Sequence, residues 1–150
     1  MLKNLKFATA AIALGGVLPI WGFAATPGAA GTTQTPAAAG ALVSVKPSAE
    51  YTEDPLRSTP ATWVSNCPKY RFCTTQVGST GRNIGFQFYR CAEYALTNWG
   101  VNGNSYRLVY NNQNVTVNYL NQRHGVVDST GPWKSDVVNF KPIWYISLCN

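Results

Sequence analysis

The sequence contains few of the residues that build metal centres or nucleophilic active sites. Its 150 residues include one histidine, His124, and four cysteines, none of which forms a C-x-x-C pair. A zinc site needs several clustered cysteine, histidine or carboxylate ligands, so we expect neither a metal nor a cofactor. An even number of cysteines also argues against a free thiolate beside His124, which removes support for a cysteine nucleophile.

Charge is scarce as well, since only 12% of the residues are charged and the formal net charge is +6. The lysines and arginines after the N-terminal region are scattered singly along the chain. No cluster among them resembles the basic footprint of a nucleic-acid-binding protein. We therefore do not expect nucleic acid as a partner.

A long apolar run occurs only near the N-terminus. Residues 1–25 combine a basic start, an apolar stretch broken by glycine and proline, and small residues at the end, which predicts a cleaved signal peptide. We expect a secreted or periplasmic protein with no membrane span after signal removal. Residues 26–60 are rich in Ala, Thr and Pro and predict a flexible linker, with the alternative that ALVSVKP is a first edge strand. The folded domain is expected over 61–150.

The cysteines are expected to be structural. A domain of this size is marginal without covalent links, and export to an oxidising compartment favours disulfides. The sequence does not choose among the three pairings that are possible for Cys67, Cys73, Cys91 and Cys149, of which two are the main candidates. One joins Cys73 to Cys91 and Cys67 to Cys149, and the other joins Cys67 to Cys73 and Cys91 to Cys149.

Alternating apolar residues predict strands over about 70–77 and 84–88, separated by the turn sequence VGSTGRN. Apolar residues at helical spacing predict one helix over about 90–99. Two further alternating runs over 105–120 predict a β-hairpin, residues 121–136 are expected to form a long loop, VVNF a short strand, and IWYISLC the last strand. The fold class is thus α+β and mainly β: an OB-like barrel or an antiparallel sheet with one helix.

Several of these segments together resemble the binding subunits of pertussis-type and subtilase-type AB5 toxins. They are a cysteine in a strand (RFCTTQVGSTG), a second cysteine after a turn, a helix-like AEYALTNWG, a strand beginning GNSYRLVY, and a last strand ending in cysteine (IWYISLCN). The resemblance covers about residues 70–150. It implies a small secreted OB-fold domain that forms a homo-oligomeric ring, associates with a partner toxin subunit and binds host glycans. No binding residue of that family is transferred to this chain.

Aromatic residues are the strongest candidates for ligand binding. A ring with one polar edge is suited to packing flat against a sugar or a protein. Trp133 is expected to be exposed among turn residues, and Tyr106, Tyr110 and Tyr119 to line one face of the hairpin. Trp99 and Trp144 are expected in the core. The favoured interpretation is a module without chemistry of its own that binds a glycan or a cell-surface protein. An equal alternative is that these tyrosines only cover the core.

An enzymatic alternative rests on three scattered residues. A ribonuclease-like phosphodiesterase would use Glu93 as general base, His124 as general acid and Arg107 on the phosphate. The competing interpretation is that Glu93 and Arg107 are solvated surface charges. A third class is a secreted inhibitor or protein-interaction domain that presents the loop 121–136.

Overall fold

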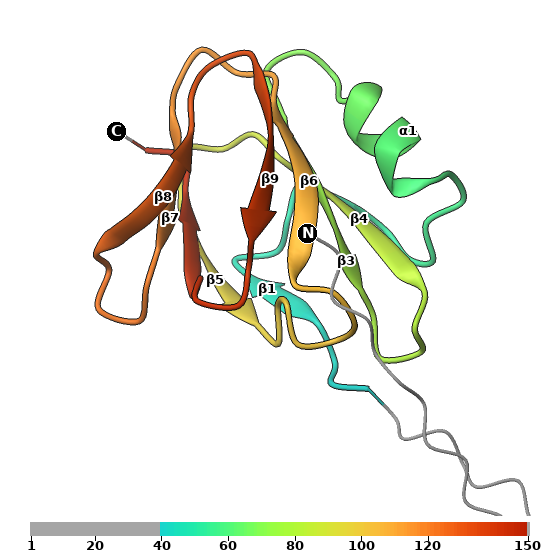
Figure 1. The fold of residues 1–150 in the computed structure, drawn as a ribbon. Helices are drawn as coiled ribbons and strands as arrows, with labels where there is room; N and C mark the ends of the chain where they lie inside the picture. The colour runs from blue at the N-terminus through green and yellow to red at the C-terminus, as the bar shows by residue number, and fades with distance from the viewer. Residues whose placement is uncertain (1–39, 150) are drawn as a thin grey trace, which may run out of the picture. The chain divides into compact units, whose positions relative to one another are not determined.

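The computed structural model describes residues 40–149, so the expected signal peptide and the first part of the expected linker lie outside the described residues. The elements are β1 (Ser44–Lys46), β2 (Tyr51–Glu53), α1 (Pro60–Ser65), β3 (Phe72–Val77), β4 (Asn83–Phe88), β5 (Glu93–Thr97), β6 (Tyr106–Asn111), β7 (Val117–Leu120), β8 (Val126–Thr130), β9 (Lys134–Asn139) and β10 (Tyr145–Ser147). They form two antiparallel sheets, with the orders β1-β5-β10-β7-β8 and β2-β4-β3-β6-β9 (Figure 1). We call them the β5 sheet and the β3 sheet.

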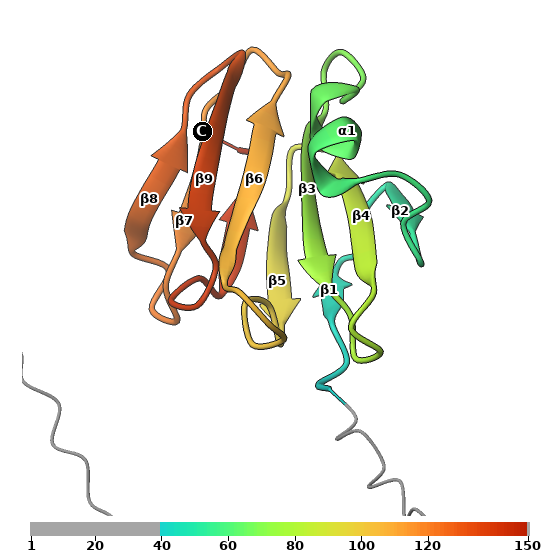
Figure 2. The same cartoon turned by 45° about the vertical axis from the view of Figure 1, so that its right-hand side comes forward.

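The two sheets form two layers with the hydrophobic core between them (Figure 2). Phe72 and Phe88 from the β3 sheet meet Tyr94, Tyr119 and Ile146 from the β5 sheet, and all five side chains are fully buried. The prediction of a mainly β domain with antiparallel sheets is confirmed. Over residues 40–149 the strands form two separate sheets rather than a closed barrel.

Strand β3 lies at the centre of its sheet and is buried on both faces, because α1 covers part of the outer face. Thr59 caps α1 by accepting a hydrogen bond from the backbone N–H of Thr62 at 3.1 Å. Trp63 of α1 packs directly on Gly85 of β4, where a Cβ atom would lie 2.5 Å from the indole. Glycine at this position therefore permits the helix to dock.

The helix predicted over 90–99 is wrong, because residues 93–97 form strand β5 in the middle of the β5 sheet. The apolar residues of this segment have helical spacing because Trp99 enters the core from a turn after the strand. Tyr94 and Leu96 alternate inward along the strand, and the backbone then turns through positive φ at Asn98 (58°) and Gly100 (70°). This turn returns Trp99 to the core, where it is buried, as expected for this tryptophan.

The hairpin predicted over 105–120 is also wrong in its pairing. Both strands exist, but β6 belongs to the β3 sheet and β7 to the β5 sheet. The buried side chain of Asn111 explains the crossing, because its amide donates to the carbonyls of Val115, Thr130 and Gly131 at 2.7, 3.0 and 3.0 Å. The expected loop 121–136 instead contains β8, an edge strand whose Val126 and Val127 are exposed and give no alternating pattern.

The folded domain begins earlier than residue 61. The β1 and β2 strands, at residues 44–46 and 51–53, pair with β5 and β4, so this part of the expected linker belongs to the sheets and the edge-strand alternative is confirmed. Glu50 fixes the connection between β1 and β2. Its carboxylate, 2% exposed, accepts hydrogen bonds from the backbone N–H of Tyr89, from Nε of Arg90 and from the hydroxyl of Tyr94, at 2.8, 2.6 and 2.7 Å.

All four cysteines form disulfides, in the second of the two main pairings considered above. Cys67 joins Cys73, six residues away, and Cys91 joins Cys149 across 58 residues. The second disulfide links the segment before β5 to the segment after β10, its neighbour in the sheet. In the described part of the chain, no helix has the length and apolar character needed to cross a membrane.

Candidate ligand-binding site

Two exposed aromatic rings meet where the connection from α1 to β3, which carries Tyr70, and the β8–β9 turn, which carries Trp133, come together. The rings of Tyr70 and Trp133 lie 6.0 Å apart at an angle of 66°, and the residues are 57% and 46% exposed. The ammonium group of Lys69 lies 5.1 Å from the centre of the Tyr70 ring. We call this group the Tyr70–Trp133 corner. The predicted exposure of Trp133 is confirmed, whereas Tyr70 was not among the residues expected to bind a ligand.

The corner rests on a closely bonded frame made from three segments, 66–72, 110–114 and 131–135. The N–H of Tyr70 donates to the carbonyl of Asn112 at 2.6 Å, and the N–H of Asn112 donates to the carbonyl of Arg71 at 2.9 Å. Asn111 links the same frame to Gly131, as described above. The Cys67–Cys73 disulfide closes the first segment onto β3. The two rings are therefore presented on a rigid support.

Both aromatic residues of the corner have left-handed backbones. Tyr70 has φ of 65° and Trp133 has φ of 56°. Bulky residues avoid this region, and each such residue costs on the order of 1 kcal/mol or more unless its surroundings impose it. Both side chains remain about half exposed. Backbone strain of this kind is concentrated at functional sites, so the two conformations mark the corner as a candidate site.

A strip of uncharged side chains leads to the corner along the outer face of β6. Tyr106 and Tyr110 share this face, and between them Leu108 is paired with Val137 of β9. Tyr106 and Val137 are both more than half exposed. The two tyrosines are four positions apart, so their Cα atoms are about 13 Å apart in an extended strand. The expectation that Tyr106 and Tyr110 line one face is confirmed.

Tyr119 does not belong to this face, and its prediction as a ligand-binding residue is wrong. It lies on β7 in the other sheet and is fully buried, because its ring fills the core. Its hydroxyl forms a hydrogen bond of 2.8 Å with Oγ1 of Thr130, and burial raises the pKa of the phenol. Trp144 differs in the opposite sense: it was expected in the core but is 47% exposed, because the flanking Ile143 and Ile146 are buried there instead.

Glu93 and His124 lie together on the β5 sheet. Nδ1 of His124 lies 2.9 Å from Oε1 of Glu93, and the imidazole stacks on Tyr145 with ring centres 4.2 Å apart. His124 has φ of 59°, in the turn between β7 and β8. Nε2 of His124 makes no hydrogen bond with any residue between 40 and 149.

Arg107 does not join this pair. It lies on β6 in the other sheet, and its two terminal nitrogens donate to the carbonyls of Tyr106 and Asn102 at 3.0 and 3.2 Å. Burial lowers the pKa of the guanidinium. The enzymatic alternative requires Glu93, His124 and Arg107 to lie together, and the structure brings only the first two together, because β6 pairs within the β3 sheet.

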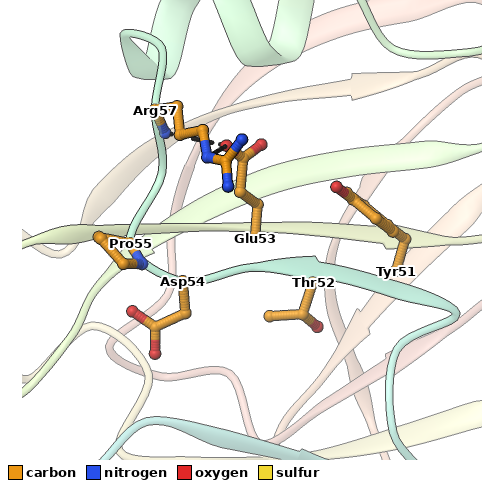
Figure 3. Close-up of a pocket in the computed structure, with 6 residues that line it drawn as sticks. All are labelled: Tyr51, Thr52, Glu53, Asp54, Pro55 and Arg57. Carbon is orange, nitrogen blue, oxygen red and sulfur yellow. Dashed lines mark hydrogen bonds and ion pairs between the residues drawn. The ribbon is translucent and has the colours of Figure 1, made fainter.

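A surface pocket of about 660 Å³ lies beside the edge strand β2. Its lining residues are Tyr51, Thr52, Glu53, Asp54, Pro55 and Arg57, and Tyr51 and Glu53 project to one side of the strand while Thr52 and Asp54 project to the other (Figure 3). Arg57 reaches Glu53 at 3.8 Å but its side chain is 93% exposed. One continuous segment forms this pocket, and its arginine side chain is almost fully exposed to solvent. The pocket is therefore a weaker candidate site than the corner, which rests on three hydrogen-bonded segments. Sequence reasoning missed it because this segment was assigned to the linker, although YTEDPLR carries a cluster of charges there.

No protein-family model, curated protein or solved structure matches this chain.

Proposed function

We propose that this protein is a secreted module that binds a glycan on another cell through the Tyr70–Trp133 corner and the adjoining strip of β6. The observation that carries the proposal is the pair of exposed aromatic residues held in strained backbone conformations. Glycine or asparagine at the two positions would adopt the same backbone conformation with less strain, so the fold alone does not require aromatic side chains there. Ligand binding gives a physical reason for keeping them.

The chemistry around the rings suits a saccharide. The faces of pyranose rings carry C–H groups that pack against aromatic rings, and their hydroxyls need neutral donors and acceptors. Ser135 and Asn139 of β9 stand opposite Tyr110 and Tyr106 and supply such groups on the same face. The rigid frame beneath the corner lowers the entropy lost on binding.

Alanine variants on a glycan array test the proposal. Trp133→Ala and Tyr70→Ala should each weaken binding by about tenfold or more, as expected for exposed aromatic anchors of a binding site. Trp144→Ala is the matched control, since Trp144 is similarly exposed but lies outside the corner. Circular dichroism of each variant verifies folding. An array on which the wild type binds no glycan would reject the proposal and leave a protein receptor or an inhibitor role as the alternatives.

Export and assembly belong to the same proposal. The two disulfides are compatible with an oxidising compartment. Assembly into a ring with a partner toxin subunit is implied only by the AB5 resemblance. Analytical ultracentrifugation of the mature protein would detect a ring, and a purely monomeric species at micromolar concentration would count against this part of the proposal.

The second candidate function is hydrolysis of a phosphodiester at Glu93 and His124. The 2.9 Å contact between them favours it, because a carboxylate that orients a histidine is an arrangement used in general acid–base catalysis. Arg123, the neighbour of His124, would take the phosphate-binding role first assigned to Arg107. His124→Ala and Glu93→Gln should then abolish RNA cleavage while Trp133→Ala leaves it unchanged. Undetectable cleavage by the wild type would end this candidate.

A further inference from the structure

We infer that the ligand is an extended, uncharged polysaccharide chain, which lies along the outer face of β6 from the Tyr70–Trp133 corner to Tyr106. This inference rests on the proposed glycan binding and adds the shape, length and charge of the ligand. A single terminal sugar, in contrast, would occupy the corner alone. Three features of the outer face support the extended chain: the uncharged side chains of β6 and β9, their hydroxyl groups, and the length of the strip.

All charged residues of β6 and β9 lie on the face opposite to the strip. The two strands contain three of them, Arg107, Lys134 and Asp136. Because side chains alternate along a strand, the register of β6 with β9 places these three on the same face as the buried Val109 and Val138. The outer face takes only uncharged side chains from the two strands, namely Tyr106, Leu108, Tyr110, Ser135, Val137 and Asn139. A charged ligand group would lose hydration there without an ionic partner on these strands, so the face suits a neutral ligand.

Hydroxyl groups are spread along the same face. The side-chain hydroxyls of Tyr106, Tyr110 and Ser135 form no hydrogen bond with any residue between 40 and 149. Each can both donate to and accept from a sugar hydroxyl. Leu108 and Val137 lie between them as a pair and offer apolar contact to the C–H groups of a sugar ring. Since these groups extend over the length of β6, several sugars of one chain can be bound at the same time.

The length and course of the strip select an extended chain. The Cα atoms of Tyr106 and Tyr110 are about 13 Å apart, which is longer than one sugar ring, and the corner continues the strip beyond Tyr110. The helix α1 contacts both β3 and β6, so a chain on the strip lies between this helix and the open edge at β9 (Figure 2). Chains of β-1,4-linked sugars are extended and present flat faces along their length, whereas α-1,4-linked glucose chains coil. A β-linked chain can therefore follow the whole strip, and an α-linked chain cannot.

Titration calorimetry with the mature protein tests the length and shape of the ligand. The probes are the hexasaccharides and disaccharides of β-1,4-linked glucose, xylose and N-acetylglucosamine, together with the α-1,4-linked glucose hexasaccharide. At least one β-linked hexasaccharide should bind about tenfold more tightly than its own disaccharide and than the α-linked chain. Because the ligand carries no charge, its affinity should not change with added salt.

Tyr106→Ala distinguishes a bound chain from a bound terminal sugar, because Tyr106 lies at the end of the strip away from the corner. It should weaken binding of the hexasaccharide about fivefold and leave binding of the disaccharide unchanged. Trp133→Ala should weaken binding of both by about tenfold, since it removes a ring of the corner. Trp144→Ala is the matched control, because Trp144 is 47% exposed, close to the 55% of Tyr106, but lies outside the strip. It should leave both affinities unchanged.

The outcomes separate this inference from the proposed function. If a disaccharide binds as tightly as its hexasaccharide, or if only a terminal sugar on the array binds, the extended chain is wrong while glycan binding stands. Normal hexasaccharide binding by Tyr106→Ala would overturn the inference in the same way. Equal affinity for the α-linked and β-linked hexasaccharides would reject the extended shape, and tighter binding of an acidic glycan on the array would reject the neutral charge. If no saccharide binds in the titration or on the array, both the inference and the proposed function fail.

Discussion

Replacement of Glu50 by glutamine should destabilise the domain. The Glu50 carboxylate accepts three hydrogen bonds, and both the Arg90 and the Tyr94 bond end on Oε1. A glutamine that keeps its oxygen at this position turns its amide NH₂ toward the N–H of Tyr89, so that a donor meets a donor. The lost bond from the Tyr89 N–H and the weaker bond from the Tyr94 hydroxyl to a neutral acceptor together cost about 1–2 kcal/mol, with no contribution counted for the exposed Arg90.

The effect should depend on pH in a defined direction. Burial alone would raise the pKa of Glu50. The hydrogen bonds from Tyr94, Arg90 and the Tyr89 N–H lower it by more than burial raises it, so the pKa lies below the ordinary value of 4.5. A carboxyl group with a lowered pKa in the folded state contributes stability above its unfolded pKa and loses that contribution as the pH falls through the folded value. The free-energy gap between wild type and Glu50→Gln should therefore be full at neutral pH and shrink in acid.

Urea unfolding of the two proteins at pH 7 and at acidic pH measures this gap. Glu53→Gln is the matched control, because its partner Arg57 is almost fully exposed and the pair should contribute less than about 1 kcal/mol. A double-mutant cycle with Tyr94→Phe should give a coupling energy of about 1 kcal/mol or more, since the two groups share a hydrogen bond. If Glu50→Gln unfolds at the wild-type urea concentration at pH 7, or if the gap is unchanged in acid, the reasoning is refuted.

Two further changes test the packing of the fold. Replacing Cys91 and Cys149 by alanine opens a loop of 58 residues and should lower the free energy of unfolding by about 4 kcal/mol in the chain-entropy model, as measured by urea denaturation; a loss below 1 kcal/mol would contradict this. Gly85→Ala places a methyl group 2.5 Å from the indole of Trp63, so it should lower the free energy of unfolding by about 1–3 kcal/mol, as measured by thermal unfolding. Gly131→Ala is the control, because its methyl group meets only a lysine side chain at 3.6 Å and should change stability little. Equal costs for the two variants would argue against the docking of α1 on Gly85.

Local sequence signals predicted the strands that alternate cleanly but failed where tertiary contacts decide. Strands β3 and β4 and the turn between them follow the alternation and the turn residues of VGSTGRN. Residues 90–99 contain both a helical and a strand pattern, and pairing with β1 and β10 on either side selects the strand. Single-sequence periodicity contains no information about such neighbours.

The same limit explains the outcome at the candidate sites. Trp133 was found because turn residues around it signal exposure, but nothing local to Tyr70 indicates that the β8–β9 turn will lie against it. Glu93 and His124 are 31 positions apart, and they meet because β10 lies between β5 and β7 and the β7–β8 turn folds back over that strand. The sequence therefore indicated which kinds of side chain could form a site, but not which of them lie close together in space.

The strained corner and the crossing at Asn111 have a common origin, which gives the strain a structural basis as well as a functional one. The chain leaves β6 at Asn111 and crosses to the other sheet, and Asn111 binds Thr130 and Gly131 on the way. Tyr70 is tied to the same connection through Asn112, so the crossing fixes both sides of the corner at once. Asn111→Leu would leave the buried carbonyls unpaired and release both rings. We expect it to weaken glycan binding more than Trp133→Ala does, because it removes the frame of both aromatic residues while Trp133→Ala removes one ring. Binding measured on the folded fraction would decide, and full affinity in Asn111→Leu would show that the corner does not depend on the crossing.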